Sequence, residues 1–242
     1  MFINHHPDSE LLTAFAAGSL PLSQALCVST HIEMCQQCQA NNRRLKRLGA
    51  FVFDASAPAK VSRSLKDSVL KQLDAPSKVQ VPVKVQVQVQ VQPKLAAQAQ
   101  QGALDHAIPK SLRQFIPNSF ADLSWKRVSP SIKQVNLCTD GNGAQVALLS
   151  INPGGKSGVH THMGEEITMI LKGAFSDETG IFQKGDFVLR DSRHKHKPIA
   201  TKDGECICLT VLDAPIQFTG VFTRWLNPLL RRSYDVPKGL SA

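Results

Sequence analysis

The first 73 residues carry apolar side chains at the spacing of amphipathic α-helices. Capping residues and an early acid precede the first apolar face and Gly18 follows it, which is the usual order at the two ends of a helix. The spacing predicts four helices: between Pro7 and Gly18, from Pro21 or Leu22 to His31, from about Cys35 to Leu48, and from Val61 to Leu73. The second helix is expected to use one face, made by Leu22, Ala25, Leu26 and Ser29. We therefore expect a helical module at residues 1–77.

The pattern changes abruptly at Lys78, where valine and glutamine begin to dominate the sequence. The two residue types alternate strictly from Val85 to Gln92, and this period of two could by itself indicate a β-strand. However, the segment has low complexity, and Pro82 and Pro93 bracket it. An extended linker over residues 78–107 is the better interpretation, with an edge strand as the alternative.

From about Ile108 the chain consists of short apolar runs separated by glycine, without helical spacing between them. Three runs are long enough to predict individual strands: Gln145–Leu149, Glu166–Leu171 and Cys206–Leu212. Many short strands with regular turns are typical of a β-sandwich or barrel. We expect this all-β module at residues 108–222, followed by a tail at residues 223–242 that is either a short helix or an arm.

The composition limits the classes of protein to which the chain can belong. Apolar residues make up 42% of the 242 residues, yet no apolar run reaches the roughly 18 residues of a membrane span. The first eight residues have neither a basic start nor an apolar core, so we expect no secretory signal and a cytoplasmic protein. The formal charge is +9, but residues 1–77 carry only eight Lys and Arg against six Asp and Glu. The remaining basic residues are dispersed and lack a nucleic-acid-binding motif, so direct binding to nucleic acid is not expected.

A histidine and two cysteines with the spacing of metal ligands lie between the second and third predicted helices. His31, Cys35 and Cys38 form an HxxxCxxC motif, which presents three donors to one point whether a helix runs through it or breaks near Cys35. Zinc in a structural site takes four tetrahedral ligands, and imidazole and thiolate suit it. His6 is the candidate for the fourth ligand, with its neighbour His5 as the rival. A redox-active CxxC is the alternative, but such a motif normally follows a strand.

The residues around this motif also carry a family resemblance. The N-terminal segment closely resembles ChrR-type anti-sigma factors, a branch of the zinc-containing anti-sigma family, in His6-Pro7, Ala16-Ala17-Gly18-Ser19-Leu20, His31 and Cys35-Gln36-Gln37-Cys38. The resemblance implies that His6, His31, Cys35 and Cys38 are zinc ligands. It also implies that the helical module wraps an extracytoplasmic-function sigma factor and blocks its contacts with RNA polymerase.

A second set of candidate ligands lies in the predicted β module. His160 and His162 are two residues apart, so on a strand they point to the same face, and Glu166 follows four residues later. This spacing is close to the first sequence motif of cupin barrels, whose interior gathers such side chains around one metal ion. The motif therefore predicts a cupin barrel with a metal site inside it.

The second cupin motif is expected to begin at Gly185-Asp186 and to end with a histidine. His194 and His196 both qualify, and we favour His196 because His196-Lys197-Pro198 resembles the ChrR-like cupins better. The proline of the general cupin pattern is absent from this segment. Three imidazoles and a carboxylate can hold zinc, iron, manganese or nickel. The family resemblance favours zinc here too, which makes two zinc sites in total.

The two modules together predict a multidomain α + β protein, in which a small zinc-bound helical bundle is followed by an all-β cupin barrel. The four cysteines outside the HxxxCxxC motif are expected to be buried core residues. For Cys206 and Cys208, which share a face of one strand, oxidation or metal binding is the alternative; the other two are Cys27 and Cys138.

The resemblance implies a regulator and not an enzyme. It implies an anti-sigma factor that inhibits a sigma factor and releases it in response to oxidative stress such as singlet oxygen, sensed through the cupin domain. The alternative is a cupin metalloenzyme, a dioxygenase or an isomerase, with an accessory helical domain. The HxxxCxxC motif and the distant His6 favour the regulator, because a metabolic cupin has no need of them.

Overall fold

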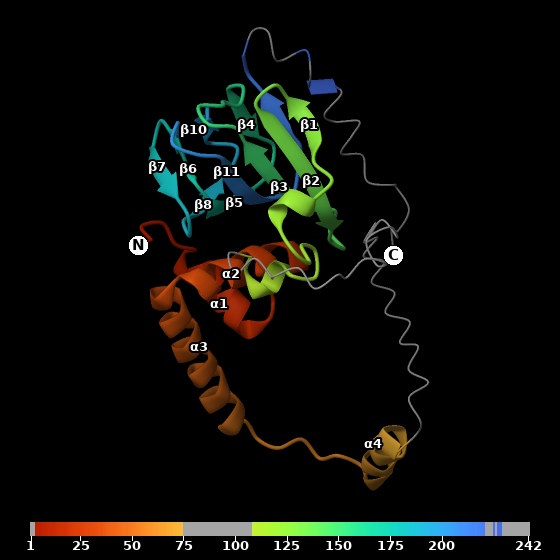
Figure 1. Cartoon of the computed structure of the whole chain (residues 1–242). Helices are drawn as coiled ribbons and strands as arrows, with labels where there is room; N and C mark the ends of the chain where they lie inside the picture. The colour runs from red at the N-terminus through yellow and green to blue at the C-terminus, as the bar shows by residue number, and fades with distance from the viewer. Residues whose placement is uncertain (1–2, 75–107, 221–224, 226, 229–242) are drawn as a thin grey trace.

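The computed structural model describes residues 3–74, 108–220, 225 and 227–228 (Figure 1). The predicted linker and most of the predicted tail lie outside these residues. Within the described ranges, four α-helices come first: α1 (Ser9–Ala17), α2 (Leu22–Met34), α3 (Gln36–Asp54) and α4 (Arg63–Asp74). Two short 3₁₀ helices follow in the same ranges: η1 (Lys110–Leu112) and η2 (Phe120–Asp122). The strands are β1 (Lys126–Ser129), β2 (Ile132–Thr139), β3 (Gln145–Ile151), β4 (His160–His162), β5 (Glu166–Lys172), β6 (Ala174–Asp177), β7 (Gly180–Gln183), β8 (Phe187–Arg190), β9 (Lys195–His196), β10 (Ile199–Ala200), β11 (Cys206–Leu212) and β12 (Ile216–Phe218).

The α-helices form where the hydrophobic spacing predicted them, with two differences in length. Helix α1 begins where the Asp8 carboxylate accepts the Leu11 N–H at 2.7 Å, and it ends at Gly18, which has a left-handed φ of 72°. Helix α2 continues beyond His31 to Met34, and α3 continues beyond Leu48 to Asp54. Neither extension contains proline, and apolar spacing alone locates the end of a helix only to within a few residues.

The predicted face of α2 is only partly correct. Leu26 is buried, but Leu22 is 49% exposed, and the most deeply buried side chains of the helix are those of Cys27, Val28, Thr30 and His31. The helix therefore buries a face that combines apolar and polar side chains. The cause is its packing against the β module.

The described part of the β module contains one large sheet and two small ones. The large sheet has the strand order β1-β2-β3-β11-β5-β8, and the small sheets have the orders β10-β6-β7 and β12-β4-β9. The strand pairings are antiparallel. The interior of the module holds an apolar cluster that includes Ile170, Phe175, Phe182, Val188, Cys206 and Cys208.

The central strands β5 and β11 are buried on both faces. Along β11, Cys206 and Cys208 belong to the interior cluster, whereas Ile207, Leu209 and Val211 belong to a second cluster that includes residues of the helices. Strands buried on both faces occur in sequence as continuous apolar runs, as these two do. Figure 1 shows α1 and α2 beside the large sheet and α3 extending away from it. The helical module therefore covers the outer face of the central strands.

One stripe of α2 makes specific contacts with the β module. Ser23 Oγ donates to the Asp140 carboxylate, and Thr30 Oγ1 lies 2.9 Å from Ser111 Oγ in η1. His31 Nδ1 lies 2.9 Å from the carbonyl oxygen of Gly185. At about 3.6 residues per turn, Ser23, Thr30 and His31 lie on the same side of the helix. The two modules are therefore packed against each other along α2.

The helices also bear on whether the chain can cross a membrane. No single helix among those described is long and apolar enough to do so. The consecutive helices α1 and α2 are long and apolar enough only when taken together. They are bent by 107° at the break between them.

Candidate metal centres

The structure brings the four candidate ligands of the N-terminal motif together. We refer to His6, His31, Cys35 and Cys38 as the first cluster. Cys35 has an extended conformation, with φ −107° and ψ 108°, so it ends α2 and begins α3. Of the two geometries that the sequence allowed, the structure has the broken helix. This break places Cys38 in the first turn of α3, close to the last turn of α2.

Four donor–donor distances in the first cluster have the length that a tetrahedral zinc site requires. His6 Nδ1 lies 3.4 Å from His31 Nε2, 3.4 Å from Cys35 Sγ and 3.5 Å from Cys38 Sγ. His31 Nε2 lies 3.3 Å from Cys38 Sγ. With metal–ligand bonds of about 2.0–2.3 Å, tetrahedral donors are about 3.3–3.8 Å apart. The residues present therefore fit a zinc ion at their centre.

The protonation of the first cluster is compatible with this fit. Burial lowers the pKa of His31 to about 4, so its imidazole is neutral near pH 7, and Nδ1–H donates to the Gly185 carbonyl. The Nε2 lone pair then faces the other three donors. Burial, together with the nearby Cys35, raises the pKa of the Cys38 thiol to about 12. A buried thiol of this kind ionises when a metal cation is bound beside it.

The candidate ligands in the β module also converge. We refer to His160, His162, Glu166 and His196 as the second cluster. The two histidines of β4 lie beside His196 of β9, which pairs with His160 in the antiparallel ladder, and Glu166 is the first residue of β5. His196 Nε2 lies 3.0 Å from His160 Nε2 and 3.1 Å from His162 Nε2. All four residues are buried.

Contacts on the outer side of two of these histidines fix which nitrogen faces inward. His160 Nδ1 donates to the Gly158 carbonyl at 2.8 Å, and His196 Nδ1 donates to the Asp177 carboxylate at 3.1 Å. In both rings this leaves the Nε2 lone pair available to a metal ion, an arrangement common around metal-binding histidines. Asp177 is itself 3.4 Å from Arg190 Nη2.

Two polar atoms of the second cluster are buried without a hydrogen bond. His162 Nδ1 and Glu166 Oε2 are 3.1 Å apart, yet they are not oriented to bond to each other, and neither has another partner among the described residues. Burial raises the pKa of Glu166 to about 7 and lowers that of His162 to about 3. A buried carboxylate oxygen without a hydrogen bond is rare unless an ion or water satisfies it, and a cation beside the imidazole Nε2 atoms would do so for Glu166 Oε2. The cluster therefore fits a metal cation.

The second cluster is less selective for one metal than the first. At bond lengths of about 2.1 Å, donors are about 3.4 Å apart in a tetrahedron and about 3.0 Å apart in an octahedron. The imidazole separations of 3.0 and 3.1 Å are closer to the octahedral value. Divalent metals other than zinc are therefore also compatible with this site.

The two rival histidines lie outside the clusters. His5 Nδ1 lies 3.3 Å from the Asp186 carboxylate, and His194 Nδ1 lies 2.8 Å from that of Asp191. The geometry therefore favours His6 and His196 as ligands, the two that the sequence analysis also preferred.

The remaining cysteines are all buried. Cys206 and Cys208 share the interior face of β11, with their Sγ atoms 3.6 Å apart. Burial and, to a smaller extent, the neighbouring Cys138 raise the pKa of the Cys27 thiol. Both pairs lie in apolar clusters, as expected of core residues.

Three supporting residues were not recognised in the sequence as parts of a site. Asp177 supports His196, Gly185 supports His31, and Asp186 binds the segment that carries His6. The sequence indicates Gly185 and Asp186 only as the start of a cupin motif. Their contacts with His31 and with Asn4 link residues 154 and 182 positions apart, and no local spacing could indicate them.

Comparisons with known proteins bear on the fold and the family of the chain. Residues 114–214 match the family model described as the ChrR cupin-like domain. The chain is 33% identical over 232 residues to the anti-sigma-E factor ChrR of Cereibacter sphaeroides, an alignment that covers 96% of this chain and 100% of the relative. It is also similar to a chain in the crystal structure of Rhodobacter sphaeroides SigE in complex with the anti-sigma ChrR. That match has 30% identity and a TM-score of 0.69, and it covers 87% of this chain and 100% of the other. The predicted order, with helices first and an all-β cupin fold second, is confirmed.

Proposed function

Because this chain belongs to the ChrR family of anti-sigma factors, we propose that it binds and inhibits a sigma factor of the extracytoplasmic-function class. The observation that carries the proposal is the 33% identity to an anti-sigma factor over 96% of the chain, which includes both modules. The similar crystal structure contains ChrR in complex with SigE. A regulator is therefore favoured over an enzyme, and we place its action in the cytoplasm, where sigma factors meet RNA polymerase.

Exposed apolar side chains of the helical module support a protein partner. The second half of α3 exposes Leu48, Phe51, Val52 and Phe53, and the exposed fraction of Phe53 is 79%. Every residue of α4 whose burial is described is exposed, and the apolar ones include Leu65, Val69 and Leu73 on one side of the helix. Apolar side chains gathered on exposed helices usually mark a binding surface. We assign these residues of α3 and α4 to the sigma-binding surface.

The first cluster would stabilise the part of the molecule that presents this surface. Its four residues connect the start of the chain to α2 and α3. We propose zinc at this site, because two thiolates and two imidazoles are a typical zinc ligand set. We also propose zinc at the second cluster. When bound, zinc supplies structural closure and no redox chemistry of its own.

We further propose that oxidative stress such as singlet oxygen is sensed through the cupin module, residues 108–222, and weakens the binding of sigma to the helical module, residues 1–77. Strand β8 supports this division, because its two ends contact the supports of the two clusters. At one end, the Phe187 N–H donates to the carbonyl oxygen of His5 at 3.0 Å. At the other end, Arg190 lies 3.4 Å from Asp177, which supports His196. A tenfold weakening of sigma binding requires only about 1.4 kcal/mol of difference between two states.

Charge substitution on α4 tests the sigma-binding surface. In Leu65→Asp a carboxylate replaces an apolar side chain at the proposed contact, so the affinity should fall by roughly 100-fold or more. Ser64→Asp adds the same charge about 100° around the helix, away from Val69 and Leu73, and should change the affinity by less than about threefold. Affinity is measured by titration against a purified extracytoplasmic-function sigma factor from the same genome. Equal affinities in the two variants would remove α4 from the proposed surface.

A further inference from the structure

The turn between β7 and β8 contacts the N-terminal segment that carries His6. Asp186 Oδ1 accepts the N–H groups of Asn4 at 2.9 Å and of His5 at 3.1 Å. The Phe187 N–H donates to the carbonyl oxygen of His5 at 3.0 Å. The backbone immediately before His6 is therefore held by two consecutive residues of the cupin module.

Asp186 is fully buried, and its second oxygen bonds within its own turn. Oδ2 accepts the Gln183 N–H at 2.9 Å. Burial acts to raise the pKa of Asp186, but the hydrogen bonds from Gln183, Asn4 and His5 outweigh this effect and hold the pKa below its usual range. The carboxylate is therefore ionised near pH 7, and it joins the turn to the N-terminal segment.

Gly185, the residue before Asp186, contacts the first cluster directly. Its carbonyl oxygen accepts from His31 Nδ1 at 2.9 Å. Its φ is 95°, and a Cβ at this position would lie 2.6 Å from the Ile3 side chain, so glycine is required there. The two histidines of the first cluster are thus held by one dipeptide, His31 directly and His6 through the residues before it.

We propose that Gly185 and Asp186 are positioning residues of the first metal site, so that the cupin module sets how tightly the helical module retains its metal ion. His6 lies 25 residues before His31, its nearest fellow ligand in the sequence, so the ordering of its ring depends on what holds the segment around it. Asp186 supplies this anchor, and Gly185 fixes the orientation of the His31 ring. The proposal rests on the proposed function only in that the first cluster binds a metal ion.

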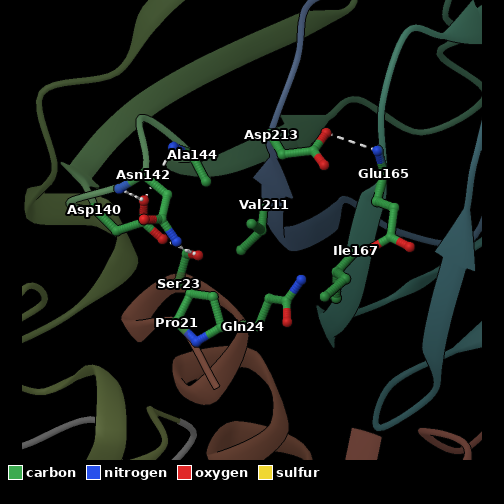
Figure 2. Close-up of a pocket in the computed structure, with 10 residues that line it drawn as sticks. All are labelled: Pro21, Ser23, Gln24, Asp140, Asn142, Ala144, Glu165, Ile167, Val211 and Asp213. Carbon is green, nitrogen blue, oxygen red and sulfur yellow. Dashed lines mark hydrogen bonds between the residues drawn. The ribbon is translucent and has the colours of Figure 1, made fainter. Parts of the chain in front are cut away.

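A matched control exists at another contact between the modules (Figure 2). Asp140 is also a buried carboxylate of the cupin module: Oδ1 accepts the Asn142 and Ala144 N–H groups, and Oδ2 accepts from Ser23 of α2. It lies beside a cavity of about 180 Å³ between α2 and the large sheet. Ser23 is eight residues from His31, or about 12 Å along the helix, so this contact is remote from the first cluster. Asp140→Asn therefore alters a comparable contact without touching the metal site.

The test measures metal retention in the full-length chain without any sigma factor. Metal-free, reduced protein is titrated with Co²⁺, whose charge-transfer absorption with thiolate reports a site with cysteine ligands and not one with only histidine and glutamate. A chelator of known affinity then competes for the ion. Asp186→Asn should weaken Co²⁺ binding by roughly 10-fold or more, as is usual when the support of a metal ligand is lost. Asp140→Asn should stay within about twofold of the unchanged chain.

Asn4→Pro covers the case in which Asp186→Asn does not fold. It removes the backbone N–H that Asp186 accepts, and residue 4 lies outside every described helix and strand, so the barrel is left intact. This variant should also weaken Co²⁺ binding. Unchanged binding in the folded variants, or an equal loss in Asp140→Asn, would overturn the proposal. Absence of the thiolate band in the unchanged chain would instead refute the metal assignment on which the proposal rests.

Discussion

The first cluster is assembled across the boundary between the two modules, whereas the second is assembled inside one of them. His31 of the first cluster is supported by Gly185, which lies 154 residues away in the other module. His160 and His196 of the second cluster are supported by Gly158 and Asp177 of the same module. The first cluster can therefore respond to changes in either module, whereas the second depends on the barrel alone.

The two clusters also differ in what surrounds them. The first lies where α2 and α3 meet, and helices in proteins owe most of their stability to packing, so metal binding would contribute much of the local stability. The second lies among antiparallel strands that pack around an apolar interior. We infer that losing the first metal ion unfolds its surroundings, whereas losing the second leaves the barrel folded.

Removing a ligand from each cluster tests whether only the first metal ion is needed for folding. Of the variants considered, the one in the first cluster should have the largest effect on stability. Cys38→Ser should remove about one metal equivalent and unfold the helical module, because structural zinc supplies roughly 10–16 kcal/mol of apparent binding energy in small domains. His196→Ala should remove the other equivalent and leave the helical circular dichroism signal nearly unchanged. Metal analysis together with circular dichroism checks both. Full metal content in Cys38→Ser would contradict the ligand assignment.

Separating the helical module from the cupin module should have the next largest effect on stability. A fragment ending near Leu73 retains α3 and α4, so it should still bind and inhibit the sigma factor. It exposes the face of α2 that packs on the cupin module, and each large apolar side chain that becomes exposed costs about 1.5–3 kcal/mol. We therefore expect a lower melting temperature than that of the helices in the full chain. If the fragment is folded but does not inhibit, the division of roles between the modules is wrong.

The signalling role of the second cluster requires a smaller change in free energy than the loss of a structural metal ion or of a module. His160→Ala, Glu166→Gln and His196→Ala should retain basal inhibition but lose most of the induction by photosensitised oxidant. A tenfold induction corresponds to a change of about 1.4 kcal/mol in the free energy of sigma binding. The loss of the cupin metal ion is large enough to supply such a change. Transcription from a sigma-dependent promoter, measured with and without the oxidant, gives both quantities. Normal induction in these variants would show that the cupin metal is not needed for sensing.

The smallest change, in the free energy of unfolding, is expected for a substitution at the edge of the contact between the modules. The exposed Glu33 carboxylate accepts the N–H groups of Lys110 at 2.6 Å and Ser111 at 2.8 Å. Glu33→Gln should cost less than about 1 kcal/mol, because solvent weakens exposed charged contacts. Glu10→Gln, at an exposed position in α1, is the control. Chemical denaturation of both variants measures the difference, and a cost several times larger would mean that this edge holds the modules together.

Much of the fold and of both clusters could be predicted because their signals are local. The HxxxCxxC motif brings its three donors together within eight residues at the junction of α2 and α3, and the pair of histidines on β4 depends on the period of one strand. The C-terminal ends of α2 and α3 were harder to locate than that of α1, which Gly18 marks, because no residue type marks them in the sequence.

The packing of the two modules was not predicted, although part of its signal was present. The continuous apolar runs of β5 and β11 indicate strands buried on both faces, and a barrel wall exposed to solvent would alternate instead. The complementary stripe on α2 is small and polar, with Ser23, Thr30 and His31, so hydrophobic spacing pointed to another face. Polar contacts over such sequence distances depend on the folded structure and leave no local pattern.

Transcription in a purified system shows whether the helical module inhibits a sigma factor. RNA polymerase core enzyme, an extracytoplasmic-function sigma factor from the same genome and a template with its promoter are mixed with the zinc-loaded full-length chain. Transcript formation should fall to background as the chain reaches one equivalent of sigma. Leu65→Asp should require a large excess to do the same. Undiminished transcription at a large excess of the zinc-loaded chain would mean that the helical module does not inhibit the sigma factor.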